Sequence, residues 1–432
     1  MNVSEIAKNA NASALVLAHL STDLKNQALG MMADALEEHC DAILSANKKD
    51  LEFAENEGVA KALIARLALN DEKVRGMAKG IRSVVALPDP VGRVKSVMEM
   101  DQDLMLEQVT CPIGVIGAIF ESRPDAVPQI SSLCFKSGNA VILKGGKEAQ
   151  NSNKVIVKLL VEAISKVPGV PQSAVQMIET RADVVDMLKE EKYIHLIIPR
   201  GSNAFVKYIQ ENTRIPVLGH SEGVCHGYID QFADLDMAIR LCLDAKLQYP
   251  AVCNAMETLL VHKNFAEKVL PDLVEEFREK QVELVGCVKT CKVTPEVSPA
   301  CESDWDLEYN DLKLSIKIVD GFSEAVKFIN KHGSGHTDMI VTENRERAEQ
   351  FLNEVSSANV MWNASTRFAD GFKYGLGAEI GISTNRTHAR GPVGLEGMVI
   401  YKYKLYGNGQ IVADYSGDNA REFTHKPLTP PL

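Results

Sequence analysis

Ser137–Lys144, with the sequence SGNAVILK, decides the fold of this chain. A glycine-containing turn leads into four apolar residues, and a short apolar run of this kind is typical of a buried strand. Ile113–Phe120 is a second such run, while Pro124–Phe135 and Asn151–Lys166 have the apolar spacing of helices. Strands and helices alternating in this order predict parallel βαβ units and therefore an α/β fold.

The same alternation continues towards the C-terminus. Further strands are predicted at Val175–Ile178, Ile194–Ile198 and Val217–Leu218, with helices at Ala182–Lys189 and Ala204–Asn212. A second α/β block is predicted from about Cys225, with strands at Thr258–Val261, Ser315–Val319 and Met339–Val341 and helices at Asp234–Leu247, Phe265–Lys280, Ser323–Lys331 and Arg345–Val355. Thr290–Asp311 is irregular and acidic, so we predict a surface insertion there.

The two ends of the chain depart from this pattern. From Ile6 to about Val85 apolar residues recur at helical spacing, which predicts an all-helical segment. Leu104–Thr110 alternates like a solvated strand. Near the C-terminus, two more alternating stretches flank the turn signal Tyr406–Gly409, so we predict a hairpin of Met398–Lys404 with Gln410–Ala413.

Composition narrows the class of protein. The 432 residues are 45% hydrophobic and 24% charged, which is typical of a globular protein of two or three domains. The net charge of −11 and the lack of a basic run argue against nucleic acid and membrane surfaces as partners. Nine cysteines without a framework spacing, and no basic, apolar leader at the start, predict a reduced, cytoplasmic setting.

No standard nucleotide-binding motif is present, since G-x-G-x-x-G and a complete P-loop are both missing. Two predicted strand ends are candidates instead, because ligands of open α/β sheets bind at the carboxyl ends of strands. One carries Lys144. The other carries Pro199–Asn203 (PRGSN), where Gly201 permits close approach and Ser202 caps a helix whose free N–H groups suit a phosphate. From the residues alone, a solvated lysine and an ordinary N-cap are equally good interpretations.

Cys253 has the most informative context of the cysteines. In Tyr249–Ala255 (YPAVCNA), a proline-interrupted loop before a predicted helix start would lower the pKa of its thiol. Residue chemistry alone nevertheless favours a packed thiol, because buried cysteines are common. The Cys287, Cys291 and Cys301 group lacks the further ligands of a zinc site, so we expect thiol chemistry without a metal.

Several blocks occur in order between about residues 100 and 400. They are Pro112–Gly117, Phe120–Asp125 (FESRPD), Ser137–Lys144, Ile198–Ser202, Gly219–His226 (GHSEGVCH), Tyr249–Ala255, Gly333–Asp338 (GSGHTD) and His388–Gly397 (HARGPVGLEG). Jointly they resemble the aldehyde dehydrogenase superfamily and, more narrowly, its gamma-glutamyl phosphate reductase (glutamate-5-semialdehyde dehydrogenase) family of proline biosynthesis. The resemblance implies NADPH-dependent reduction of L-glutamyl 5-phosphate to L-glutamate 5-semialdehyde.

The resemblance also implies roles for individual residues. Cys253 matches the family nucleophile, which would expel phosphate and form a thioester that NADPH reduces. Lys144 matches a lysine beside the adenosine ribose, Gly201 and Ser202 a turn beside the pyrophosphate, and Glu379 the glutamate that holds the nicotinamide ribose. Candidate groups for the oxyanion and the substrate are Ser122, Arg123, Asn254, Arg367 and Arg390. For any one of these arginines, a surface ion pair is an equally good interpretation.

The implied architecture is aldehyde-dehydrogenase-like, with two α/β domains built on parallel sheets and a small β oligomerisation flap. Residues 1–100 and 114–224 would bind NADPH, with a helical N-terminal part. Residues 225–385 would form the catalytic domain, and residues 101–113 and 386–432 the flap and the C-terminal tail. We expect a homo-oligomer without a metal, in transient contact with a glutamate kinase because an acyl phosphate is labile.

Two other functions remain open at this point. One is a thioester-forming reductase that acts on an acyl-CoA or on another acyl phosphate, and the blocks Glu121–Pro124 and His388–Gly397 argue against it. The other is a non-catalytic member of the fold that binds a nucleotide, and the joint presence of Cys253, Lys144 and Glu379 argues against that. Glu222 is not assigned as a general base, because a base that activates water would hydrolyse the thioester.

Overall fold

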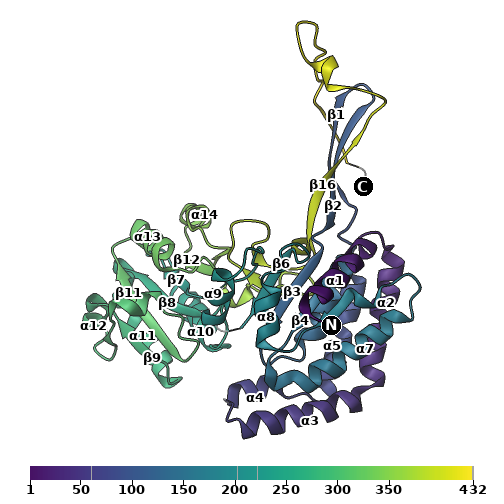
Figure 1. Ribbon diagram of the computed structural model, residues 1–432. Helices are drawn as coiled ribbons and strands as arrows, with labels where there is room; N and C mark the ends of the chain where they lie inside the picture. Colours follow the sequence, from purple (N-terminus) through teal and green to yellow (C-terminus); the bar gives the residue numbers. More distant parts are fainter. Residues whose placement is uncertain (60, 202, 221, 431–432) are drawn as a thin grey trace.

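The structure is a computed structural model that describes residues 1–59, 61–201, 203–220 and 222–430. Figure 1 shows two α/β bodies beside each other and a β arm that projects away from them. The first body is built on the sheet β5-β4-β3-β6, the second body on the sheet β10-β9-β11-β8-β7-β12-β13, and the arm on the sheet β16-β2-β1-β17.

The first body has a parallel sheet whose central strand, β3, is buried along its whole length. Burial on both faces explains why the sequence of this strand is continuously apolar. The strands are β3 (Val115–Phe120), β4 (Ala140–Lys144), β5 (Val175–Met177) and β6 (Leu196–Arg200). The helices are α1 (Val3–Leu17), α2 (Thr22–Glu38), α3 (Cys40–Asn56), α4 (Lys61–Leu67), α5 (Asp71–Ala86), α6 (Ala126–Lys136), α7 (Gln150–Ser165), α8 (Arg181–Met187) and α9 (Asn203–Glu211).

Asn139 fixes the turn that opens β4. Its buried side-chain oxygen accepts a hydrogen bond from the Gly114 N–H at 2.8 Å. Its amide nitrogen donates to the hydroxyl of Ser137 and to the backbone carbonyl of Met398, each at 2.8 Å. One side chain therefore ties the starts of β3 and β4 to the base of the arm.

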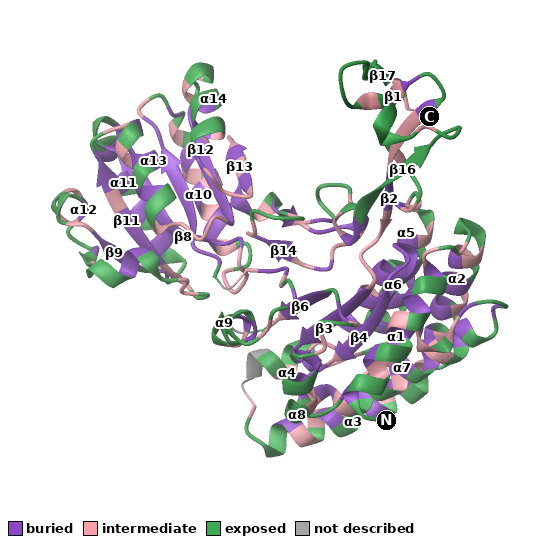
Figure 2. Cartoon of the chain, turned by 45° about the horizontal axis from the view of Figure 1, so that its top comes forward, coloured by how far each residue is buried: buried purple, intermediate pink, exposed green. Residues whose placement is uncertain are grey.

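The second body is a seven-stranded sheet in which every paired neighbour is parallel. Its strands are β7 (Cys225–Ile229), β8 (Met256–His262), β9 (Glu283–Gly286), β10 (Ser298–Pro299), β11 (Lys313–Val319), β12 (Thr337–Val341) and β13 (Asn359–Trp362). Its helices are α10 (Leu235–Leu247), α11 (Lys263–Glu279), α12 (Val288–Val293), α13 (Phe322–His332) and α14 (Arg345–Glu354). Figure 2 shows the buried strands between more exposed helices.

The arm is an antiparallel sheet of β1 (Val94–Asp101), β2 (Leu104–Pro112), β16 (Val399–Tyr406) and β17 (Lys426–Leu428). The predicted hairpin of Met398–Lys404 with Gln410–Ala413 is wrong, because β16 pairs with the distant β2 instead. Val412–Tyr415 forms a 3₁₀ turn. Seven of the eight residues of β16 are exposed, as the green arm in Figure 2 shows.

After β13 the chain returns to the first body. The short strands β14 (Ile382–Ser383) and β15 (Gly391–Pro392) pair there, and Ile380 and Val393 are buried in the first body's core. The segment that leads from the first body to the second lies beside the segment that returns, since the side chain of Asn385 in the returning segment donates to the Val217 carbonyl at 2.5 Å. The two bodies are therefore connected by neighbouring crossings of the chain.

Most of the predicted elements are confirmed to within a few residues. Val217–Leu218 is not a strand, because Val217 forms only an isolated bridge with Ile197. The predicted surface insertion Thr290–Asp311 is partly wrong: it contains β10, and Trp305 packs in the core against Phe328 with ring centroids 5.7 Å apart. Within the described part of the chain, no helix is long and apolar enough to cross a membrane.

A buried ion pair joins α10 to β8 in the second body. Lys246 Nζ donates to Glu257 Oε2 at 2.5 Å, and both side chains are fully buried. The other carboxylate oxygen of Glu257 accepts the Asn310 N–H at 3.2 Å. The carboxylate is therefore compensated only as long as the lysine is present.

Lys246→Met should lower the free energy of unfolding by about 3–5 kcal/mol, because it leaves the Glu257 carboxylate buried without a counter-charge. The double variant Lys246→Met/Glu257→Leu should recover most of this loss. Urea denaturation followed by tryptophan fluorescence reports on the second body, since both tryptophans, Trp305 and Trp362, lie in it. Equal stability of the single variant and the unchanged protein would contradict the prediction.

Candidate active site

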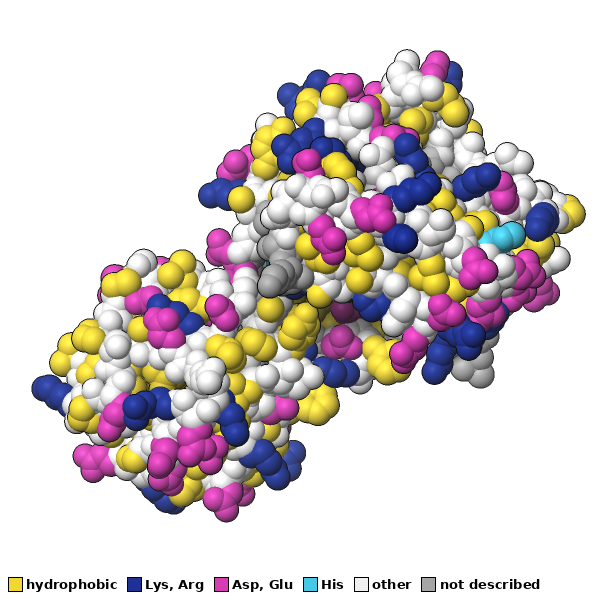
Figure 3. Space-filling model, turned by 90° about the horizontal axis from the view of Figure 1, so that it is seen from below, with side chains coloured by type: hydrophobic (Ala, Val, Ile, Leu, Met, Phe, Trp, Pro, Cys, Tyr) yellow, Lys and Arg dark blue, Asp and Glu magenta, His cyan; other side chains and the backbone are white. Residues whose placement is uncertain are grey.

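A cavity of about 840 Å³ lies where the two bodies meet. Figure 3 shows the surface hollowed between them, with charged side chains in the hollow. The charged residues described in its lining are Arg66, Lys73, Arg123, Asp125, Arg200, Arg367, Asp370 and Glu379. Five are cationic and three are anionic, so this lining favours an anionic ligand.

Cys253 lines this cavity from the turn between α10 and β8. The predicted helix start after Cys253 is wrong, because strand β8 begins at Met256, and the argument from a helix dipole does not apply. The Cys253 carbonyl accepts a hydrogen bond from the Cys225 thiol at 3.1 Å. A Cβ atom at Gly223 would lie 2.3 Å from the same carbonyl oxygen, so only glycine lets the loop before β7 pack on Cys253.

Two histidines flank the Cys253 thiol. Each of the three side chains offers one ligand atom, and the ligand atoms of His220, Cys253 and His336 all lie within 4.8 Å of one another. The imidazole rings are edge to face, with centroids 4.8 Å apart. Burial lowers the pKa of His220, which keeps its ring neutral at pH 7.

The sheet order explains why these three residues meet. β8, β7 and β12 are adjacent and parallel, so their amino ends share one edge of the sheet. Cys253, His220 and His336 all lie in the segments that lead into these strands. The sequence contains both histidines in quoted blocks, but the missing prediction of β7 left their proximity to Cys253 undetected.

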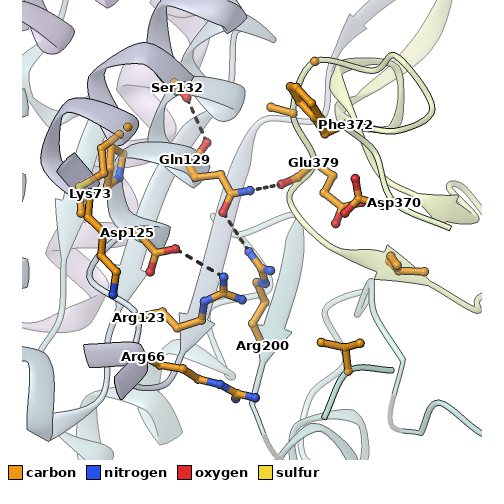
Figure 4. Close-up of a pocket in the computed structure, with 18 of the residues that line it drawn as sticks. Arg66, Lys73, Arg123, Asp125, Gln129, Ser132, Arg200, Asp370, Phe372 and Glu379 are labelled. Atoms are coloured by element: carbon orange, nitrogen blue, oxygen red, sulfur yellow. Dashed lines mark hydrogen bonds and ion pairs between the residues drawn. The ribbon is translucent and has the colours of Figure 1, made fainter. Parts of the chain in front are cut away.

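Glu379, in the returning chain, lines the same cavity as Cys253, and Gln129 of α6 holds its backbone. Gln129 Nε2 donates to the Glu379 carbonyl at 2.8 Å, and Arg200 Nη1 donates to Gln129 Oε1 at 3.3 Å (Figure 4). Glu379 Oε2 accepts the Gly371 N–H at 2.8 Å. Burial raises the pKa of Glu379 and lowers the pKa of Arg200 to about 10.

Three predicted substrate groups line the same cavity as Cys253: Arg123, Asn254 and Arg367. Arg123 is 3.4 Å from Asp125, and Arg367 Nε donates to Gln248 at 2.9 Å. Asn254 donates to the Ala369 carbonyl at 2.8 Å, while its buried Oδ1 has no hydrogen-bond partner among the described residues. Each arginine therefore keeps part of its fork available for a ligand.

The other predicted residues lie outside this lining, as far as the chain is described. Lys144 is the last residue of β4 and Gly201 follows the last residue of β6, so both lie at the same edge of the sheet, and burial lowers the pKa of Lys144. Ser122 donates its hydroxyl to Glu148 at 2.6 Å, and Arg390 donates to the Ser356 carbonyl. Ser202 is outside the described residues. The roles expected for these residues remain predictions.

The sequence reasoning missed several residues of the cavity. Arg66 of α4 reaches across to the Cys253 loop and donates to the Ala251 carbonyl at 3.4 Å. Lys73 of α5 also lines the cavity, and Figure 4 shows Arg66, Arg123 and Arg200 in the same part of the site. Arg200 lay in a quoted block, but no local pattern in the sequence marks Arg66 or Lys73. A thiol beside several guanidinium groups is suited to an electrophile that carries negative charge.

Comparison with known proteins supplies the family. The model of the aldehyde dehydrogenase family matches residues 1–302. Gamma-glutamyl phosphate reductase of Acetivibrio thermocellus is 54% identical over 428 residues, which are 99% of each chain. The same enzyme of Methanosarcina mazei is 54% identical over 434 residues, 98% of this chain and 97% of that one.

Solved structures agree with this assignment. The crystal structure of gamma-glutamyl phosphate reductase of Thermotoga maritima is 42% identical, with a TM-score of 0.93 over 95% of this chain and 100% of that chain. An acetylating aldehyde dehydrogenase of Geobacillus thermoglucosidasius, 17% identical, shares the fold with a TM-score of 0.66 over 95% of this chain and 97% of that chain. The chain therefore belongs to the aldehyde dehydrogenase family of oxidoreductases and, within it, to the gamma-glutamyl phosphate reductases.

Proposed function

We propose that this enzyme reduces L-glutamyl 5-phosphate to L-glutamate 5-semialdehyde with NADPH, through a thioester on Cys253. The observation that carries the proposal is the position of Cys253 in a cavity lined by Arg123, Arg200 and Arg367. An acyl phosphate brings a carbonyl carbon for the thiol and negative charge for the arginines. The names of the relatives, gamma-glutamyl phosphate reductase, support the same substrate.

The first chemical step uses residues of the cavity alone. The Cys253 thiolate attacks the γ-acyl carbon, so that a C–S bond forms, the C–O bond to phosphate breaks, and phosphate leaves with the electron pair. The backbone N–H of Cys253 donates to the transient oxyanion. Arg123, Arg367 and Asn254 hold the oxyanion, the departing phosphate or the α-carboxylate, since guanidinium forks match the geometry of phosphate and carboxylate.

NADPH, when bound, supplies the hydride that reduces the thioester and releases the aldehyde from Cys253. The residues at the carboxyl ends of β4 and β6 fit a dinucleotide. Lys144 offers a cation for the adenosine ribose and its 2′-phosphate, and a Cβ at Gly201 would lie 2.9 Å from Glu121, so the turn before α9 is tightly packed. Glu379 would hold the nicotinamide ribose, and Gly201 and Ser202 the pyrophosphate.

We assign NADPH binding to residues 1–100 and 114–224, catalysis to residues 225–385, and the flap and tail to residues 101–113 and 386–432. Two parts of the chain depart from these bounds: β1 belongs to the arm, and Ile380 and Val393 belong to the core of the first body. The arm is the surface through which copies of the chain associate. Tyr401, Tyr403 and Leu405 are exposed on β16, which is an edge strand, and an exposed apolar edge is stabilised by pairing with another subunit.

We place the enzyme in proline biosynthesis in the cytoplasm, with transient contact to a glutamate kinase that supplies the labile acyl phosphate. We propose no metal as resident cofactor.

Cys253→Ser should lower kcat by about 10³-fold or more, because the hydroxyl is a far weaker nucleophile than the thiol. Binding of NADPH, measured by the change in its fluorescence, should persist. Cys301→Ser is the matched control, since this cysteine is exposed and outside the described cavity lining. Turnover by the Cys253 variant at the normal rate would contradict the thioester mechanism.

The reverse reaction tests the acyl acceptor. With glutamate 5-semialdehyde and NADP⁺, NADPH should appear only when inorganic phosphate is added, because phosphate resolves the thioester. Absorbance of NADPH with and without phosphate measures this directly. Turnover in buffer without phosphate would instead indicate a hydrolytic dehydrogenase.

Lys144→Ala should weaken NADPH binding about 10–100-fold and NADH binding much less, since loss of a charge-assisted hydrogen bond costs about 1.5–3 kcal/mol. Lys147→Ala is the control, because that lysine is exposed and pairs loosely with Glu57 at 3.7 Å. Titration of both nucleotides against each variant gives the two affinities. Equal losses for NADPH and NADH would exclude a contact of Lys144 with the 2′-phosphate.

A further inference from the structure

We propose that Cys253, His220 and His336 form a Zn²⁺ site that blocks the nucleophile reversibly. A thiolate and two imidazoles are a ligand set that zinc prefers. One ligand atom of each residue already lies within 4.8 Å of the other two. Zinc with bonds of about 2.0–2.3 Å holds its ligand atoms roughly 3.5 Å apart, so side-chain movements of about 1 Å close the site.

The hydrogen bonds behind the imidazoles are those of metal ligands. His220 Nδ1 is 2.7 Å from the Ile382 carbonyl, so this nitrogen carries the proton and Nε2 has a free lone pair. His336 Nδ1 is 2.8 Å from the Thr337 hydroxyl. Histidines that bind metals usually make such a bond with their second nitrogen, which fixes the ring and its tautomer.

An unsatisfied buried atom points to a ligand at this position. His336 is fully buried, and its Nε2 has no hydrogen-bond partner among the described residues. Seven further buried side-chain atoms of the described residues share this state, but His336 is the residue among them that groups with Cys253 and His220, and a bound ion is one of the explanations for such an atom. A zinc ion beside Cys253 supplies the partner that His336 lacks.

Coordination changes the chemistry of the thiol without any redox step. The Cys253 S–H bond breaks, the proton goes to solvent, and the sulfur electron pair forms a Zn–S bond. This is the electron pair that would attack the acyl carbon, so the metal excludes the substrate. The inhibitory effect rests on the proposed function, whereas the metal site rests on the three side chains alone.

Cobalt provides a readout that does not depend on turnover. The full-length enzyme, reduced and freed of metals with a chelator, is titrated with Co²⁺. We expect one equivalent to give thiolate-to-cobalt absorption and the visible bands of a tetrahedral ion, and Zn²⁺ to displace it. Cys253→Ser should abolish the thiolate band, whereas Cys301→Ser, which removes an exposed thiol 2.9 Å from Asp304, should retain it.

Variants of the two histidines distinguish a three-ligand zinc site from zinc binding to the Cys253 thiol alone. His220→Asn and His336→Asn should each weaken Zn²⁺ binding about tenfold or more, measured by competition with Co²⁺. His332→Asn is the matched control, because the His332 imidazole pairs with Asp306 at 2.7 Å and does not belong to the cluster with Cys253. His336 is buried and its variant can misfold, so His220→Asn, at a half-buried position, carries the test independently.

A thiolate–cobalt band that persists in Cys253→Ser would overturn the proposal, and so would unchanged zinc affinity in folded His220→Asn. Zn²⁺ should also slow alkylation of Cys253 by iodoacetamide and compete with the acyl substrate but not with NADPH, and a chelator should reverse both effects. Phosphate-dependent turnover without a Cys253-dependent cobalt spectrum would overturn the metal site alone. The cobalt spectrum in an enzyme inactive on the glutamyl substrate would overturn only the proposed function.

Discussion

The hydrogen bond from Gln129 to the backbone of Glu379 is the contact on which the site depends. It joins α6 of the first body to the chain that returns from the second, and the same amide accepts from Arg200. Because the bond is made to a carbonyl, it fixes the position of Glu379 without using the carboxylate. One neutral amide therefore links the returning chain to Arg200, between two half-buried charged side chains.

The two sheets contribute opposite edges to the site. In the first body, Arg200 at the carboxyl end of β6 lines the cavity, and ligands of α/β sheets are usually found at such strand ends. Cys253, by contrast, precedes a strand of the second body, at the amino ends of β8, β7 and β12. A parallel sheet gathers loops at both of its edges, so the second body can bring a thiol and two imidazoles together from segments far apart in the sequence.

The sequence predicted the first body well because its strands are uninterrupted apolar runs between turns. It missed β7 because His226 and Gly227 interrupt the apolar pattern, and the buried His226 is tolerated there by a hydrogen bond of 3.0 Å to Asp338. The false hairpin arose because alternation identifies a strand but not its partner. Cys253 could be named from resemblance, whereas Arg66 comes from a helix whose position over the cavity no local pattern determines.

The paired crossings between the bodies have a consequence for how such an enzyme arises. The chain leaves the first body beside the point where it returns, since the Thr384 N–H donates to the Gly219 carbonyl at 3.4 Å. The second body is thus an insert whose two ends meet at one place on its host. A unit attached in this way can be replaced by another without displacing the host's termini. The two bodies are therefore free to have separate ancestries.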